Sequence, residues 1–425
     1  MSELAIKGGT PLRTEPFHPW PIKDEADRTR LLEVFDSGNW SFGGPVEKSF
    51  SAKFAAYCGV KHAHCICNGS LTLELALRAL GVGPGDEVIV PAVTWIATAW
   101  AVVQVGATVK FADINESDWC ISPDAIRKTI TKHTKAIIPV HLYNQIAEMD
   151  EIMAIADEHK LKVIEDCAHT HGSRWGDRAV GAIGHIGSFS FQQTKGMTAG
   201  EGGVVITDDD ALAERIYGLK NCGRPLSPEH GPTFGSNYRI TEFQAAILHG
   251  QLDRLDEHLA TKAQNVALLR EKMADVPGIT PLAQKPQVTR QGFYSVSLHY
   301  DASQWEGLPR ELVADALRAE GLDPLFLPYE IVYKAYLYKP GAELYDYSKK
   351  QLGLDAKCPI AERIIERESL TLQHQLFLGN EQDVDDIVAI FKKVHSNAAD
   401  LKLDGLKKKA RSTARQLLEK TGLKK

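Results

Sequence analysis

Between residues 61 and 207, short apolar runs rich in β-branched residues alternate with longer runs of helical periodicity. Near-continuous apolar strands alternating with helices are typical of a parallel sheet that helices cover on both faces. We therefore predict an α/β fold with a mostly parallel seven-stranded sheet. The expected strands are Ala63–Cys67, Glu87–Val90, Val109–Ala112, Ala136–Val140, Lys162–Glu165, Ile186–Phe191 and Val204–Thr207. The helices expected between them are Leu71–Leu80, Trp95–Val105, Pro123–Ile130 and Met149–Lys160.

The pattern changes after residue 208. The chain is expected to be helical up to about residue 259, apart from a proline- and glycine-containing loop over Gly223–Ser236, and then to mix helices with strands. We predict a large domain over residues 1–259, which includes the N-terminal segment, and a smaller C-terminal α+β domain over residues 260–425. The basic tail from Lys402 to Lys425 is interpreted as a solvated terminal helix, because lysines are common at helix ends.

Charge and cysteine content exclude several classes of partner. The formal net charge of −6 provides no basic surface that would recruit nucleic acid or an acidic membrane. Val88–Val109 lacks charged residues, but Pro91 and several polar residues interrupt it, so we expect strand, helix and strand rather than a membrane span. Seven cysteines, several of them in apolar runs, favour reduced thiols, and Met1–Thr10 has no apolar signal core. We expect a cytoplasmic protein.

Two charged side chains follow expected strands. Asp166 comes directly after the strand at Lys162–Glu165, and Lys195 lies between the strand at Ile186–Phe191 and a glycine-rich stretch. In a parallel sheet, ligands bind beyond the carboxyl ends of the strands. A carboxylate there needs a cationic partner, or its pKa rises. A lysine held in such a place can lose its proton and become a nucleophile.

A third strand end suggests a site for phosphate. The strand at Ala63–Cys67 leads through Asn68, Gly69 and Ser70 into a helix, so the backbone could approach an anion at the positive helix end. Taken singly, each of the three features is explained by an ordinary turn, a structural carboxylate or a surface lysine. Together they match the phosphate, the pyridine nitrogen and the aldehyde of pyridoxal 5'-phosphate. We predict this cofactor, with Lys195 and Asp166 as catalytic residues.

The sequence resembles the DegT/StrS-type aminotransferases of sugars and cyclitols, which are fold-type I pyridoxal-phosphate enzymes. The resemblance extends from Gly8 to Gly379, and Lys195 follows Asp166 by 29 positions, as in that family. The segments that resemble it most are Glu165-Asp166-Cys167-Ala168-His169, Ser188-Phe189-Ser190-Phe191-Gln192-Gln193-Thr194-Lys195 and Thr198-Ala199-Gly200-Glu201-Gly202-Gly203.

The resemblance implies roles for further residues. Gly69, Ser70 and Ser190 would bind the phosphate, Trp95 would stack on the pyridine face, and His169 would contact the phenolic oxygen of the ring.

The segment Gly235–Glu242 resembles the one in which an asparagine, here Asn237, reaches the phosphate of a neighbouring subunit. It implies a homodimer with shared active sites. Arg239 would bind a carboxylate of the amino donor, or instead form a structural salt bridge beside the dimer interface.

The likeness is strongest to two subgroups, glutamine-dependent inosose aminotransferases and aminohydroxybenzoate synthases. It implies transfer of an amino group from L-glutamine or L-glutamate to a ketone on a cyclitol or sugar, in the biosynthesis of aminoglycosides or aminosugars. The alternatives are a pyridoxal-phosphate lyase like the aminohydroxybenzoate synthases, and a cofactor-binding regulator without transferase activity. Dehydratases of this family carry histidine in place of Lys195, which argues against that reaction.

Two interpretations from other classes are weaker. Asp166, His169 and His171 could form the ligand set of a metal hydrolase, but strand histidines such as His62 and His64 are more often buried than metal-bound, and we predict no metal. A nucleotide-dependent oxidoreductase would need a G-x-G-x-x-G turn after the first strand, which the sequence lacks.

Overall fold

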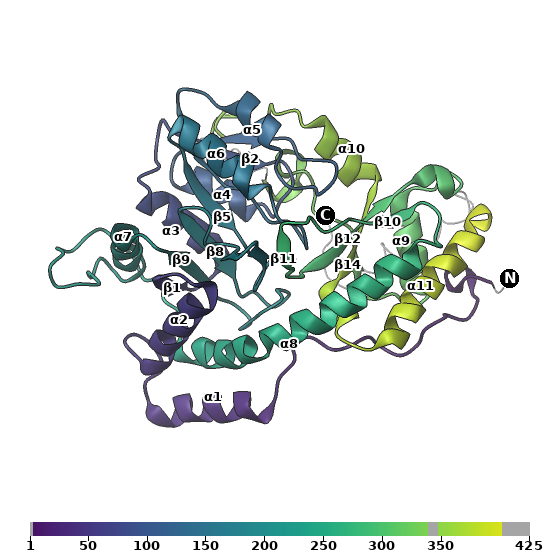
Figure 1. The fold of residues 1–425 in the computed structure, drawn as a ribbon, viewed down its shortest axis with the longest axis horizontal. Coiled ribbons are helices and arrows are strands. Elements are labelled where there is room, and N and C mark those ends of the chain that lie inside the picture. Colours follow the sequence, from purple (N-terminus) through teal and green to yellow (C-terminus); the bar gives the residue numbers. More distant parts are fainter. Residues whose placement is uncertain (1–2, 339–346, 402–425) are drawn as a thin grey trace, which may run out of the picture.

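The computed structural model describes residues 3–338 and 347–401 of the chain. A large sheet occupies one part of the molecule and a smaller sheet the other, and the long helix α8 (Glu242–Met273) runs beneath both (Figure 1). The predicted basic tail over residues 402–425 lies outside the described residues. No helix in the described ranges is both long and apolar enough to cross a membrane.

The large sheet has seven strands in the order β1-β9-β8-β5-β4-β2-β3. These are β1 (His62–Ile66), β2 (Glu87–Pro91), β3 (Thr108–Ala112), β4 (Thr134–Ile137), β5 (Lys162–Asp166), β8 (Ile186–Ser190) and β9 (Gly203–Thr207). All seven correspond to the predicted strands, and the mostly parallel α/β architecture is confirmed. Strands β3, β2, β4, β5 and β8 run parallel, whereas β9 pairs antiparallel with both β8 and β1.

The antiparallel placement of β9 has a simple geometric origin. A parallel connection between neighbouring strands requires a crossover, usually a helix, whereas an antiparallel one does not. Residues 191–202 link β8 to β9 without a helix. The connection therefore stays at one edge of the sheet, and that edge is the carboxyl end of β5 and β8. Lys195 lies in this connection.

Of the seven helices that the structure describes in this part, six contact the large sheet, and the first packs against α8 instead. The seven are α1 (Glu25–Ser37), α2 (Pro45–Cys58), α3 (Gly69–Ala79), α4 (Ala97–Gln104), α5 (Pro123–Thr129), α6 (Met149–His159) and α7 (Asp210–Lys220). Helix α3 packs against β8 and β9, and its Leu75, Ala76 and Leu77 are fully buried. It begins where the side chain of Asn68 accepts a hydrogen bond from the backbone N–H of Leu71, which satisfies one of the free donors of the first turn.

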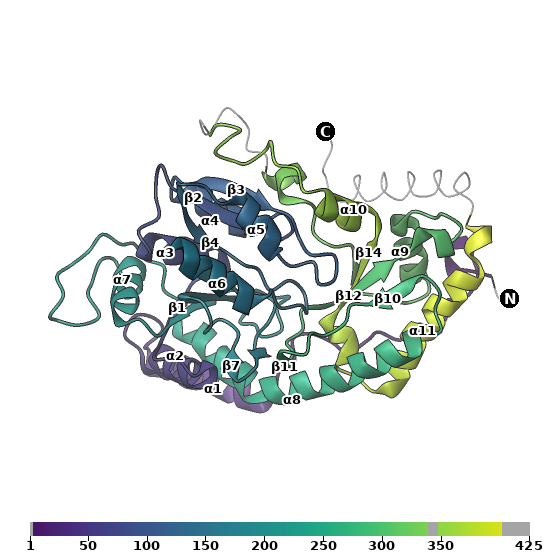
Figure 2. The same cartoon turned by 45° about the horizontal axis from the view of Figure 1, so that its top comes forward.

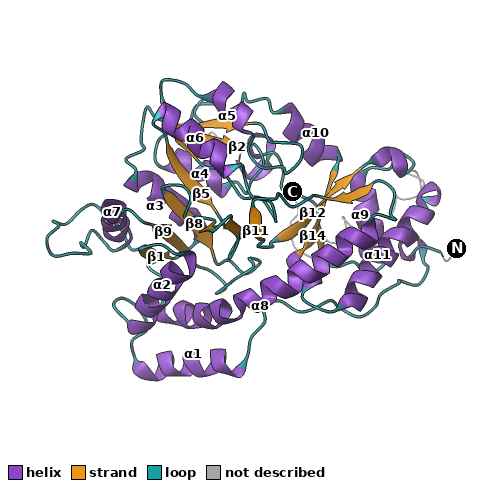
Figure 3. Cartoon of the chain, viewed as in Figure 1, coloured by secondary structure: helices purple, strands orange, loops and turns teal. Residues whose placement is uncertain are grey.

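The smaller part is built on an antiparallel sheet of order β10-β12-β14-β13. Its elements are β10 (Ile279–Pro281), β12 (Ser295–Tyr300), α9 (Arg310–Ala319), β13 (Leu325–Phe326), α10 (Pro359–Arg367), β14 (Ser369–Gln373) and α11 (Glu381–Ser396). A third sheet of short strands, β6 (Arg174–Trp175), β7 (Arg178–Ala179) and β11 (Val288–Arg290), lies between the two larger ones (Figure 3). The predicted smaller α+β unit is thus present.

The two parts are linked by α8 and by the N-terminal segment. Helix α8 passes without a break through residue 259, so the predicted division between 259 and 260 falls inside a helix and remains a prediction. The N-terminal segment lies against α9 at the far end of the molecule, near α11 (Figure 2). There the backbone N–H of Ala5 donates to Glu320, whose carboxylate also binds Lys393.

Candidate active site

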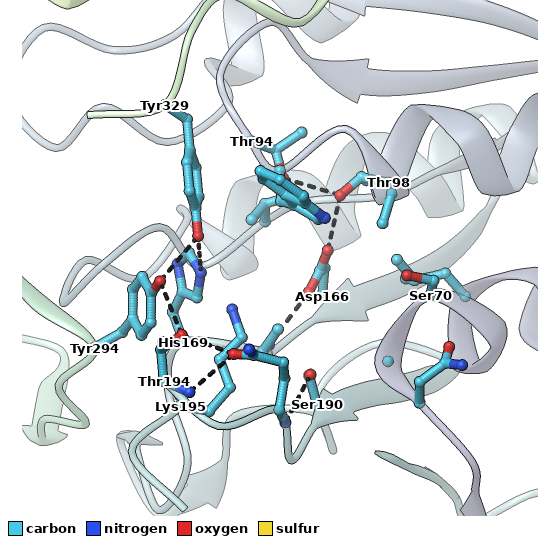
Figure 4. Close-up of a pocket in the computed structure, with 18 of the residues that line it drawn as sticks. Ser70, Thr94, Thr98, Asp166, His169, Ser190, Thr194, Lys195, Tyr294 and Tyr329 are labelled. Atoms are coloured by element: carbon cyan, nitrogen blue, oxygen red, sulfur yellow. Dashed lines mark hydrogen bonds between the residues drawn. The ribbon is translucent and has the colours of Figure 1, made fainter. Parts of the chain in front are cut away.

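A cavity of about 300 Å³ opens at the carboxyl edge of the large sheet. Seven of the nine residues predicted from the sequence line it, and they come from separate strand ends and loops (Figure 4). These seven are Gly69, Ser70, Trp95, Asp166, His169, Ser190 and Lys195. Its size falls at the lower end of the range typical of small-molecule sites.

Asp166 ends β5 and is buried at the floor of the cavity. One of its carboxylate oxygens, Oδ2, accepts a hydrogen bond of 2.9 Å from the hydroxyl of Thr98, and the other accepts one of 3.2 Å from the backbone N–H of Ala168. Burial raises the pKa of Asp166, while these hydrogen bonds and the nearby amine of Lys195 lower it. A cation placed in the cavity would favour the ionised carboxylate.

Lys195 lies opposite, in the connection between β8 and β9. Its side chain is 9% exposed, and Nζ lies 4.4 Å from the centre of the Tyr294 ring. Burial lowers the pKa of Lys195 to about 8, against the attraction of Asp166, which raises it. A substantial fraction of this amine is therefore unprotonated at mildly alkaline pH, which is the form that attacks a carbonyl carbon.

The start of α3 and the end of β8 form the third wall. Gly69 and Ser70 are the first residues of α3, where backbone N–H groups point away from the helix and attract anions. A Cβ on Gly69 would lie only 2.5 Å from Cβ of Ser190, so glycine is required for the strand end to approach the helix. This close approach brings the Ser190 hydroxyl to the same helix N-terminus.

His169 lies beside Lys195 and is buried. Its Nδ1 accepts a hydrogen bond of 3.0 Å from the backbone N–H of Tyr143, and its Nε2 lies 3.2 Å from the hydroxyl of Tyr329. Burial, with the nearby positive charge of Lys195, holds the pKa of His169 well below its usual range. The ring is therefore neutral, and because Nδ1 is an acceptor, the proton is on Nε2.

Trp95 forms the outer wall. Its side chain is 47% exposed, unusual for a tryptophan, and its ring centre lies 5.6 Å from that of Tyr329. A flat aromatic surface that is exposed at the mouth of a cavity can stack on a planar ligand.

Several lining residues were missed by the sequence analysis. Thr98 stood in an apolar helical stretch, four residues after Thr94, and only its hydrogen bond to Asp166 identifies it. Tyr294 and Tyr329 come from the smaller part of the chain, and no local motif marks either of them. Their place in the site depends on how the two parts pack.

Asn237 and Arg239 do not line this cavity. Arg239 donates a hydrogen bond of 2.9 Å to the side chain of Asn221, and its guanidinium lies 4.9 Å from the ring centre of Phe42. Both residues lie in the segment between α7 and α8, where the carbonyl of Tyr238 accepts a hydrogen bond from the backbone N–H of Cys67. Their predicted roles require a second subunit and remain predictions.

The ligand set of the alternative metal-hydrolase interpretation is not assembled as a cluster. The His169 ring stacks on Tyr294, whereas the His171 ring packs against Phe189 and Phe191. Among the described residues, the group with ligand atoms close enough to share a metal ion is His141, Glu165 and Cys167.

Glu165 in that group already has its hydrogen-bonding capacity filled. Its carboxylate accepts hydrogen bonds from the backbone N–H groups of Gly181, Ile183 and Gly184 and lies 3.1 Å from Nε2 of His141. These contacts explain the buried carboxylate as a structural one.

Comparison with known proteins gives one consistent result. Residues 21–392 match the DegT/DnrJ/EryC1/StrS aminotransferase family. A protein of Streptoalloteichus tenebrarius provisionally named L-glutamine:3-amino-2,3-dideoxy-scyllo-inosose aminotransferase is 40% identical over 94% of this chain and 100% of its own length. The L-glutamine:2-deoxy-scyllo-inosose aminotransferase of the same organism is 37% identical over 94% of this chain and all of that protein. The crystal structure of 3-amino-5-hydroxybenzoic acid synthase, 32% identical, superposes with a TM-score of 0.81 over 91% of this chain and 100% of the other.

Proposed function

Because the chain belongs to the DegT/DnrJ/EryC1/StrS aminotransferase family, we propose that it uses pyridoxal 5'-phosphate to move an amino group from L-glutamine to a ketone on a cyclitol, in aminoglycoside biosynthesis. The observation that supports this proposal is the meeting of Asp166, Lys195 and the start of α3 around one cavity. A phosphate, a pyridine nitrogen and an aldehyde would each find a complementary group there.

The residues at the start of α3 fit a phosphate. The backbone N–H groups of Gly69 and Ser70, with the hydroxyls of Ser70 and Ser190, offer hydrogen-bond donors beside the positive end of a helix dipole. These groups would anchor the cofactor by its phosphate, at the same cavity that Trp95 and Asp166 line.

Asp166 fits a protonated pyridine nitrogen. When bound, pyridoxal phosphate supplies an aldehyde for covalent attachment to an amine and a ring that withdraws electrons from the bonds at a substrate's α carbon. The carboxylate of Asp166, held by Thr98 and Ala168, would keep the ring nitrogen charged. His169 would donate its Nε2 proton toward the phenolic oxygen, and Trp95 would cover the ring face.

Lys195 would have two roles, first as the attachment point of the cofactor and then as a base. Its Nζ would hold the cofactor through the aldehyde, and as a free amine it would take a proton from the α carbon of the donor and later give that proton up. The pKa of about 8 places this group near the range in which an amine can both accept and release a proton. In the second half of the reaction, the same amine would carry out these proton transfers in reverse for the ketone acceptor.

We also propose a homodimer with shared active sites. Asn237 would reach the phosphate site of the second copy, and Arg239 would bind the carboxylate of the amino donor. Neither residue faces the cavity of its own chain, and the nearby Trp40, Phe42 and Phe234 are exposed large apolar side chains. A second copy of the chain would cover them.

All seven cysteines are free, and this supports a reducing, cytoplasmic location.

One experiment tests the proposed function and separates it from its alternatives. The purified protein, loaded with pyridoxal phosphate, is mixed separately with glutamine, glutamate and alanine, and the visible spectrum is followed for loss of the aldehyde form. Ketocyclitols and nucleotide-linked ketosugars are then tested for its recovery and for an amine product.

Glutamine followed by a ketocyclitol should give the fastest complete cycle. An aromatic product from an aminated ring would support the lyase alternative. Cofactor binding without an amine product from any donor and acceptor would contradict the proposal. It would instead support the alternative of a cofactor-binding regulator without transferase activity.

A further inference from the structure

The ring of Tyr294 contacts both His169 and Lys195 in the site. It stacks on the ring of His169, with centres 4.0 Å apart and planes 11° from parallel. The Nζ of Lys195 lies 4.4 Å from the centre of the same ring (Figure 4). A protonated amine over an aromatic face is stabilised by the negative charge density of that face.

The hydroxyl of Tyr294 belongs to a chain of hydrogen bonds whose direction can be assigned. The Thr194 hydroxyl donates to Oε1 of Gln192 over 2.8 Å, because an amide oxygen can only accept. It must therefore accept from the Tyr294 hydroxyl, which is 3.3 Å away. The Tyr294 oxygen in turn accepts from Tyr329 over 3.3 Å.

The same series of hydrogen bonds continues to His169. The proton on its Nε2 points at the oxygen of Tyr329, which has already given its own proton to Tyr294. At the other end, the backbone N–H of Tyr143 donates to Nδ1 of the imidazole. Each of the three hydroxyls, on Thr194, Tyr294 and Tyr329, donates once and accepts once, so the protons along these hydrogen bonds are consistently ordered.

The backbone on both sides of Tyr294 is also fixed. Its N–H donates to the carbonyl of Tyr143, and its own carbonyl accepts from the N–H of His374. The His374 ring lies 3.2 Å from the carbonyl of Thr194, the residue before Lys195. The smaller part of the molecule is thus tied to the lysine-bearing connection at this residue.

We propose that Tyr294 is a positioning residue for Lys195: its ring face holds the amine over the cavity, while stacking on His169 and the hydroxyl chain hold the ring. This inference rests on the proposed role of Lys195 as the reactive amine. The titratable groups near this amine are Asp166 at the end of β5, His169 and His171 after it, and Tyr294 from the smaller part.

The test measures the amine directly in the full-length chain freed of cofactor. Trace reductive methylation with formaldehyde and cyanoborohydride is run at a series of pH values, and the Lys195 peptide is quantified by mass spectrometry relative to that of exposed Lys61. The rate follows the unprotonated fraction, so it yields the titration midpoint of Lys195 without any turnover.

Tyr294→Leu removes the ring and should lower the midpoint of Lys195 by about half to one pH unit, because the protonated amine loses its aromatic partner. Tyr294→Phe keeps the ring and should leave the midpoint where it is. Tyr300→Phe is the matched control: it removes a buried hydroxyl that donates to the carbonyl of Leu308, away from the site, and should change nothing.

An unchanged or raised midpoint in Tyr294→Leu would overturn the proposal, as would an equal shift in Tyr294→Phe. Circular dichroism checks folding, and Tyr294→Met serves the same comparison if the leucine variant does not fold. Failure of the proposed function would look different: the midpoint would still respond to the ring, but no donor and acceptor pair would turn over.

Discussion

Two buried lysines occupy comparable aromatic surroundings in different parts of the molecule. Lys195 lies 4.4 Å from the ring centre of Tyr294, and Lys262, within α8, lies 5.2 Å from that of Trp20. Burial lowers the pKa of Lys195 to about 8 and that of Lys262 to about 7. Lys262 is therefore the more deeply buried of the two, and its pKa is lowered further than that of Lys195.

Their neighbours differ. Lys195 borders a cavity and shares it with the carboxylate of Asp166. Lys262 is 0% exposed, and its Nζ has no hydrogen-bond partner among the described residues. Its titratable neighbours include His258 and His374. Burial is the main cause of the lowered pKa of both histidines, and the positive charge of Lys262 lowers each pKa further.

A lowered pKa of a lysine therefore does not by itself indicate a reactive site. Desolvation lowers the pKa of any lysine that the fold encloses. Reactivity also needs space for a substrate and an opposite charge to complement the cofactor, and Lys195 has both. Lys262 is buried as a neutral amine at alkaline pH and weakens the fold as the pH falls.

The largest expected effect comes from removing each of the two amines in turn and comparing turnover. Lys195→Ala should lower kcat by about 10⁴-fold or more, because the proposed function makes this residue both attachment point and base, while Lys262→Met should keep near-normal turnover. Borohydride reduction followed by peptide mapping should find the cofactor on Lys195 in the unmodified protein. Full activity in Lys195→Ala, or a cofactor attached to Lys262, would show that Lys195 is not the reactive amine.

Removing the charge opposite Lys195 should have the next largest effect. Asp166→Asn keeps the shape of the side chain but cannot balance a protonated ring nitrogen, so kcat/KM should fall by about 10²- to 10³-fold. Asp210→Asn, an exposed carboxylate at the start of α7, is the control and should leave kcat/KM unchanged. Activity of Asp166→Asn close to that of the unmodified enzyme would contradict the assigned role.

Lys262→Met should stabilise the protein in a pH-dependent manner. The lysine's pKa is about 7 when folded and near its ordinary 10.5 when unfolded, so stability rises with pH between these values, and the penalty of burying it is complete below pH 7. The methionine variant should gain on the order of 2–4 kcal/mol at pH 7 and progressively less toward pH 10. Urea denaturation of both proteins at each pH measures the difference; a gain independent of pH would mean that packing, not charge, is responsible.

Thr98→Val should give the smallest of these effects. It removes the hydroxyl that donates to Oδ2 of Asp166, and loss of a hydrogen bond to a charged group costs roughly 1.5–3 kcal/mol. The pKa of Asp166 should rise further, and kcat/KM near neutral pH should fall by about tenfold. Thr98→Ser should restore most of the activity, and equal losses in both variants would show that the methyl group matters rather than the hydroxyl.

Local sequence was sufficient for the large sheet. All seven strands were predicted because each is an apolar run bounded by turn residues, and the strand ends placed Asp166 and Lys195 at one edge. It did not predict that β9 runs antiparallel, since the direction of a strand depends on how its connection folds back. Nor did it indicate Thr98, whose role depends on a neighbour 68 positions away.

The sequence by itself determined the α/β architecture and the chemical groups at the strand ends, because hydrophobic periodicity and short motifs are local properties. The packing of distant segments, by contrast, places Lys195 beside a cavity and Lys262 away from one, and it brings aromatic side chains of the smaller part to that cavity. Tyr294 and Tyr329 reach the site through the packing of the two parts, and the surroundings of an amine are a sum over residues distant in the chain.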